Sequence, residues 1–187
     1  MISQRFFTEI FVNEIYKPVR KLGNMNVCLD IGSCTGEFSL WVYPQAEKIY
    51  SIEANKKAFG YLKENVKDFP KITPLFLAIA GINGKVEVWG EGIGDSTIVY
   101  SQGGGVNKVK AQTLATFIQK NNIEQVDCLK IDVESAEKEI FEAKDFKDIA
   151  KKIKYIIGEH LEPSKKVLEA NGFKFETYKY GQIFKRK

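Results

Sequence analysis

The sequence is poor in the residues that build metal clusters and disulfide frameworks. Its 187 residues include one histidine and three cysteines. Cys28, Cys34 and Cys128 form no Cys-x-x-Cys pair, the usual mark of a zinc or redox motif. Because Cys28 and Cys128 lie inside apolar runs, we expect them to be small buried hydrophobes in a reducing compartment.

Long apolar runs are also missing. No apolar stretch approaches the ~20 residues that span a bilayer, and residues 1–5 do not lead into the apolar region of a signal peptide. We therefore expect a soluble, cytoplasmic protein with no membrane partner. The length is that of one ordinary α/β domain, residues 1–187, so a substrate must bind on the loops of that same domain.

Arginine is scarce for a basic protein. The formal net charge is +4 and the isoelectric point is about 8.8, but arginine occurs only at Arg5, Arg20 and Arg186. Arginine is the better residue for phosphate forks and base edges, whereas scattered lysines are typical of a solvated surface. Nucleic acid is therefore not the partner that we expect.

Apolar periodicity predicts an amphipathic helix over about residues 4–20, which can cover the sheet edge or roof a ligand site. Strands and helices then alternate, which is typical of a Rossmann-like α/β fold with a mostly parallel sheet and helices on both faces. The final strand pair reads as a hairpin that adds one antiparallel strand. The expected strands are 27–31, 48–53, 72–79, 85–89, 126–132, 153–158, 173–178 and 181–185, and the expected helices are 36–43, 55–67, 113–121, 135–142 and 163–171.

The segment Val27–Gly36 is the most informative part of the chain. An apolar run ends in Asp30-Ile31-Gly32, and a helix is expected to begin after Gly36. Glycine at these two positions permits a positive φ and lets a ligand approach the backbone closely. Glu53 ends the next strand, where a carboxylate can accept hydrogen bonds from both hydroxyls of a ribose. The G-x-x-x-G spacing differs from the G-x-G-x-x-G of pyrophosphate cofactors. The pattern therefore favours S-adenosylmethionine, which has a ribose and no phosphate.

Four motifs in order resemble the FkbM family of S-adenosylmethionine-dependent methyltransferases. Besides the glycine segment they are Leu129–Glu137 (L-K-I-D-V-E-S-A-E), Val109–Leu114 before a helix, and Ile156–His160, which ends in Glu-His. The resemblance implies a class I methyltransferase fold. It also implies methyl transfer, usually to a hydroxyl oxygen of a sugar, polyketide or related small molecule.

The chain departs from the family pattern at several positions. Family members usually read G-A-N-x-G at residues 32–36, so Ser33 or Thr35 would replace a missing asparagine; Ala54 replaces the usual proline; and Glu159 and His160 are adjacent rather than separated by one residue. The expected cofactor-binding residues are Asp30, Gly32, Ser33, Thr35, Gly36, Glu53, Ala54, Ser96 and Asp132.

The glycine-rich segment 90–105 surrounds Ser96, whose hydroxyl suits an adenine edge or a substrate. A flexible loop of this length is more often functional than accidental. A disordered hairpin tip is the alternative interpretation.

The expected catalytic residues end neighbouring strands, where an α/β fold places its ligand. They are Asp132, Glu134, Glu159 and His160. His160 would be the base, because an unperturbed imidazole is largely neutral at cytoplasmic pH. Alternatively, Asp132, Glu134 and His160 would hold a divalent cation, or the acids would be helix caps. The leading hypothesis is O-methylation of a small molecule; nucleic-acid methylation and non-catalytic cofactor binding are the alternatives.

Overall fold

A seven-stranded sheet forms the centre of the computed structural model, which describes residues 4–90, 97–99, 107–134 and 136–187. The strand order is β10-β11-β9-β8-β1-β2-β3, and β11 is the strand that runs antiparallel to its neighbours. This arrangement confirms the expected α/β class with one antiparallel strand in a C-terminal hairpin. The bounds are β1 Met25–Ile31, β2 Ala46–Glu53, β3 Ile72–Phe76, β8 Cys128–Ile131, β9 Tyr155–Gly158, β10 Phe173–Tyr178 and β11 Gly181–Arg186.

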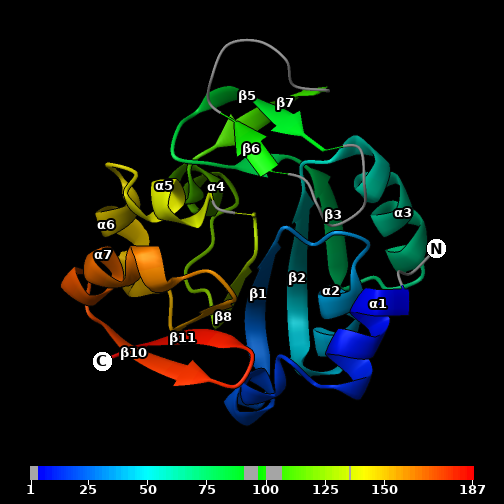
Figure 1. Cartoon of the computed structure of the whole chain (residues 1–187), viewed down its shortest axis with the longest axis horizontal. Coiled ribbons are helices and arrows are strands. Elements are labelled where there is room, and N and C mark those ends of the chain that lie inside the picture. Colours follow the sequence, from blue (N-terminus) through cyan, green and yellow to red (C-terminus); the bar gives the residue numbers. More distant parts are fainter. Residues whose placement is uncertain (1–3, 91–96, 100–106, 135) are drawn as a thin grey trace.

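Helices cover both faces of the sheet and bury one apolar core on each (Figure 1). On one face lie α2 (Glu37–Val42), α3 (Lys56–Val66) and the N-terminal segment, with the short turn η3 (Tyr43–Gln45). The other face carries α4 Leu114–Lys120, α5 Glu137–Phe141, α6 Phe146–Ile149 and α7 Lys165–Ala170, with the turns η4 Ala150–Lys152 and η5 Glu162–Ser164. Because β1, β2, β3, β8 and β9 pair in parallel, their carboxyl ends lie along one edge of the sheet.

The N-terminal segment differs from the single helix expected over residues 4–20. It forms a short α-helix, α1 (Gln4–Phe7), a π-helical turn, η1 (Thr8–Val12), and a 3₁₀ helix, η2 (Lys17–Leu22). Glu14 has a φ of 49°, in the left-handed region, so the helix ends before it. Pro18 lacks the N–H that a continuous helix would need at that position. Ile10, Ile15, Tyr16 and Val19 are nevertheless buried, as the apolar spacing predicts.

A second sheet of four strands was not expected from the sequence. Its order is β4-β7-β5-β6, with β4 Ala78–Ile79, β5 Gly84–Trp89, β6 Thr97–Val99 and β7 Asn107–Gln112. The strand expected over 72–79 is therefore wrong in extent. The Leu77 N–H still donates to the Glu53 carbonyl of β2 at 3.1 Å, but Ala78 and Ile79 pair with β7 and belong to the second sheet. Figure 1 shows the second sheet at the top of the view.

The other expected helices and strands agree with the structure to within two residues at each end. The short helix α6 was not predicted. Ser96 and most of the segment 90–105 lie outside the described residues, so their expected contacts with a ligand stay predictions. In the part of the chain that the structure describes, every helix is too short or too polar to cross a membrane.

Candidate functional site

A cavity of about 140 Å³ lies where β1, β2, β8 and β9 end. Seven of the residues expected at the site line it: Gly32, Ser33, Glu53, Ala54, Asp132, Glu134 and Glu159. Four do not line it: Asp30, Thr35, Gly36 and His160. The carboxyl ends of four strands thus bring residues that are distant in the sequence to one cavity.

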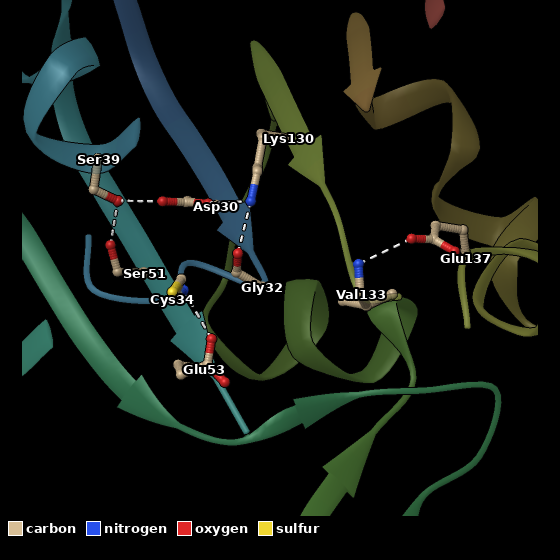
Figure 2. A network of polar contacts seen from close by, with 9 residues as sticks. All are labelled: Asp30, Gly32, Cys34, Ser39, Ser51, Glu53, Lys130, Val133 and Glu137. Atoms are coloured by element: carbon tan, nitrogen blue, oxygen red, sulfur yellow. Dashed lines mark hydrogen bonds and ion pairs between the residues drawn. The ribbon is translucent and has the colours of Figure 1, made fainter. Parts of the chain in front are cut away.

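Asp30 supports the cavity from below rather than lining it. It is fully buried, and its Oδ2 accepts a hydrogen bond of 2.6 Å from the Ser39 hydroxyl, which is also bonded to Ser51 (Figure 2). The Nζ atom of Lys130 lies 3.4 Å from Asp30 Oδ1 and donates a hydrogen bond of 2.6 Å to the Gly32 carbonyl oxygen. Burial alone would lower the pKa of Lys130, but the carboxylates of Asp30 and Asp132 raise it, so the ammonium stays charged. This network fixes the end of β1.

Gly32 and Gly36, in the loop after β1, are each required for a different structural reason. Gly32 has a φ of 72°, and a Cβ there would lie 1.8 Å from the backbone oxygen of Asp132. Gly36 has a φ of 97°, and its Cβ would lie 2.8 Å from a methyl carbon of Leu62 in α3. Close packing of β1 on the β8 end therefore requires Gly32, whether or not a ligand touches it. Gly36 is required by its packing on α3.

Glu53 is 8% exposed and is held by backbone groups on both of its oxygens. Oε2 accepts from the N–H of Cys34 at 2.8 Å, and Oε1 accepts from the N–H of Asn55 at 2.6 Å (Figure 2 shows the first). Burial raises the pKa of Glu53 to about 7, although these hydrogen bonds oppose the shift. A carboxylate has about four lone-pair sites, so Glu53 can still accept two further hydrogen bonds.

Ser33 and Thr35, the two candidates for the missing asparagine, lie in different surroundings. The Thr35 side chain is fully buried and donates to the Glu37 carboxylate, so it does not face the cavity. Ser33 is 3% exposed and lines the cavity, and its hydroxyl has no hydrogen-bond partner among the described residues. An unpaired buried hydroxyl costs free energy, which a bound ligand would recover.

Asp132, Glu134 and Glu159 form the acidic end of the cavity. Glu134 has a φ of 51°, a strained conformation that non-glycine residues rarely adopt outside functional sites. Burial, followed by the charge of Asp132, raises the pKa values of both Glu134 and Glu159. Glu137 holds the backbone between Asp132 and Glu134, because its Oε1 accepts a hydrogen bond of 2.9 Å from the N–H of Val133 (Figure 2).

His160 is exposed and lies outside the cavity lining, although its charge lowers the pKa values of Glu134 and Glu159. Within the described ranges, no group of three or more His, Cys, Asp or Glu side chains has an arrangement that could hold a metal ion.

Sequence reasoning missed several residues of the cavity wall. The N-terminal segment contributes Arg5, Phe6, Glu9, Ile10, Ile15 and Tyr16, and the second sheet contributes Ala78, Ile79 and Val88. The apolar periodicity indicated that the N-terminal segment packs on the fold, but it could not show which side chains face a ligand. Asn55 also lines the cavity, and its side chain caps α3 by accepting from the N–H groups of Lys57 and Ala58. An asparagine directly before a helix is the signal that could have found it.

Comparisons with solved structures give the same fold at low sequence identity. The FkbM methyltransferase of Methylobacillus flagellatus KT aligns with a TM-score of 0.59 and 12% identity over 86% of this chain and 43% of that one. M. capricolum TrmK in complex with S-adenosylhomocysteine gives 0.52 and 14%, over 98% and 66%. A precorrin-6y C5,15-methyltransferase of Geobacter metallireducens GS-15 gives 0.51 and 14%, over 88% and 82%. The chain thus spans less than half the length of the first protein.

No curated protein matches the chain in sequence. The methyltransferase FkbM domain, however, matches residues 30–184, which is most of the chain and includes the strand ends that form the cavity. The sheet order and the single antiparallel strand agree with that match. The chain belongs to the FkbM family of S-adenosylmethionine-dependent methyltransferases.

Proposed function

We propose that this chain transfers the methyl group of S-adenosylmethionine to a hydroxyl oxygen of a small molecule. The cavity residues suit this cofactor: Glu53 has acceptor sites left for two ribose hydroxyls, and the unpaired hydroxyl of Ser33 can bind the amino-acid end. Asp132 offers a carboxylate for the ammonium group. Bound there, the cofactor supplies an electrophilic methyl group on a sulfonium.

The observation that carries the proposal is the acidic end of the same cavity. An alcohol acceptor must lose its proton as its oxygen bonds to the methyl carbon and the carbon–sulfur bond breaks. Glu159 lines the cavity and has a raised pKa, which makes it a better proton acceptor near neutral pH than an ordinary carboxylate. We therefore assign the base to Glu159 rather than to the exposed His160. The charges of Asp132 and Glu9 also raise the pKa of Glu159, whereas those of His160 and Lys130 lower it.

The charge of the cavity wall favours a neutral acceptor over a nucleic acid. The cavity wall carries Glu9, Asp132, Glu134 and Glu159, whereas its cations Arg5 and Lys130 lie 3.0 Å from Glu9 and 3.4 Å from Asp30. Phosphate groups would be repelled by this set. The net charge of +4 therefore resides elsewhere on the surface.

The test is a transfer assay with S-adenosylmethionine labelled in the methyl group. Fractions of a small-molecule extract and, separately, total RNA are offered as acceptors. We expect label to enter a neutral hydroxylated compound, with base-stable attachment through an ether, and a rate nearly independent of salt between 50 and 200 mM. Label in RNA, with a rate that falls steeply over this salt range, would contradict the proposal.

A further inference from the structure

Tyr16 is a buried tyrosine that lines the cavity without taking part in the interactions described so far. It is 2% exposed, and its ring packs edge-to-face on Phe38 of α2, with centroids 4.9 Å apart and planes at 74°. Among the described residues, no group forms a hydrogen bond with its hydroxyl. Among the described residues, its oxygen is not one of the fully enclosed atoms that lack a partner, so it keeps access to the cavity that Tyr16 lines, where a ligand could accept its hydrogen bond.

The charges around Tyr16 show which end of the cavity its hydroxyl approaches. Burial raises the pKa of Tyr16 well above its ordinary value, and the carboxylates of Asp132 and Glu159 are the next largest causes. The hydroxyl therefore stays protonated and acts as a hydrogen-bond donor. Tyr16 lines the same cavity as Asp132 and Glu159, which follow the ends of β8 and β9.

The position of Tyr16 relative to the cofactor follows from the loop after β1. Phe38, on which Tyr16 packs, is the second residue of α2 and follows Gly36 by two residues. If Glu53 holds the ribose, Ser33 and Asp132 of the same cavity would hold the amino-acid end of the cofactor. That end carries a carboxylate, which needs donors, and an ammonium group, which needs acceptors. Ser33 and Tyr16 both line the cavity, and among the described residues neither hydroxyl has a hydrogen-bond partner.

We propose that the Tyr16 hydroxyl donates a hydrogen bond to the carboxylate at the amino-acid end of S-adenosylmethionine. Tyr16 lies before residues 30–184, which match the family domain, so this contact would come from outside the matched residues. This inference rests on the cofactor placement given above. It makes the N-terminal segment a binding element rather than a cover.

The test compares two ligands that differ at the amino-acid end. S-adenosylhomocysteine carries this end, and 5′-methylthioadenosine lacks it. Calorimetry with Tyr16→Phe, which keeps the ring on Phe38, should show S-adenosylhomocysteine binding about tenfold more weakly, because one hydrogen bond to a charged group is lost. Binding of 5′-methylthioadenosine should change by less than about twofold.

Tyr50→Phe is the matched control. Tyr50 is 4% exposed and packs edge-to-face on Phe117 at 5.5 Å, but it does not line the cavity. The Tyr50→Phe variant should bind S-adenosylhomocysteine and 5′-methylthioadenosine with the same affinities as the unmodified chain. Unchanged binding of S-adenosylhomocysteine to Tyr16→Phe, or equal losses for the two ligands, would overturn the proposal.

A measurement on the unmodified chain gives an independent check. Decarboxylated S-adenosylhomocysteine lacks only the carboxylate, so it should bind at least tenfold more weakly than the complete ligand. Tyr16→Phe should then cause no further loss, because the two changes remove the same hydrogen bond. If the losses in affinity from the missing carboxylate and from Tyr16→Phe multiplied, Tyr16 would not be the group that binds the carboxylate. No binding of S-adenosylhomocysteine to the unmodified chain would instead reject the cofactor assignment itself.

Discussion

The two ends of the cavity differ in how their carboxylates are held. At the ribose end, Glu53 is 8% exposed and both of its oxygens accept backbone hydrogen bonds. At the acidic end, Asp132 and Glu159 are half-buried, and among the described residues no hydrogen bond is found for either side chain. The first arrangement is rigid before a ligand arrives, which suits binding. The second leaves carboxylates available to a reacting molecule, which suits proton transfer.

The largest effect should come from the glycine that joins the two ends. In Gly32→Ala the new Cβ would lie 1.8 Å from the backbone oxygen of Asp132, and φ at this residue is 72°. Both β1 and β8 would have to shift, so we expect a loss of about 4 kcal/mol or more in the free energy of unfolding. Urea denaturation followed by circular dichroism measures it.

Gly60→Ala is the control for this substitution. Gly60 lies within α3, and a Cβ there would meet nothing within 4 Å. Alanine should stabilise the helix by about 0.5–1 kcal/mol. Equal stability of the two variants would show that the β1 and β8 ends are not in close contact.

The next largest effect should be on turnover, and it should distinguish the acidic end of the cavity from the ribose end. Glu159→Gln removes the proposed proton acceptor and keeps the size of the side chain. Turnover should fall by about 10²–10⁴-fold, while the affinity for S-adenosylhomocysteine changes little. In the unmodified chain, the rate should rise with pH through a pKa above that of an ordinary glutamate, because burial and Asp132 raise it.

Glu162→Gln serves as the control, because Glu162 is an exposed residue nearby in the chain whose carboxylate lies 3.9 Å from Lys165. It should leave turnover unchanged. If Glu159→Gln were fully active and His160→Ala were not, the base would be His160, as the sequence alone suggested.

At the ribose end, the expected effect is on cofactor affinity. Glu53→Ala removes a charged acceptor from a buried site and should cost about 1.5–3 kcal/mol, or more than tenfold in the affinity for S-adenosylhomocysteine. Glu47→Ala, on an exposed position of the same strand, is the control. Calorimetry gives both values, and an unchanged affinity for Glu53→Ala would remove Glu53 from the site.

The sequence predicted the central sheet well because each of its strands carries a local signal. Apolar runs bounded by turns placed the strands of the central sheet to within two residues, apart from the extra residues assigned after β3. The second sheet was missed because β4 has two residues and β7 alternates lysines with small apolar residues. Pairing between such segments is decided by long-range contacts, which a local pattern does not contain.

At the site, sequence reasoning found residues that end strands and missed those that arrive by packing. Glu53 and Glu159 end strands, so their place at the cavity follows from the topology. Asp30 and His160 also lie at or beside strand ends, but which way a side chain faces depends on the local path of the backbone. Tyr16 reaches the cavity through a broken helix, which no periodicity indicates.

The smallest expected effect is a pH dependence at the ribose end. Burial raises the pKa of Glu53 from an ordinary value of 4.5 to about 7. The ionised form is the better acceptor for ribose hydroxyls, so the affinity for S-adenosylhomocysteine should rise about tenfold between pH 6 and pH 8 and then level off. Glu53→Gln cannot titrate and should flatten this profile, as measured by calorimetry.

The stability of the ligand-free chain should show the opposite sign. Between pH 4.5 and about 7 the folded state holds a proton on Glu53 that the unfolded state has lost, so this contribution to stability is complete below pH 4.5. It decreases as the pH rises through about 7. Melting temperatures should therefore fall over the range in which affinity increases, and Glu53→Gln should weaken both trends. An affinity that falls with rising pH would show that Glu53 binds as a neutral acid, with its proton donated to the ligand.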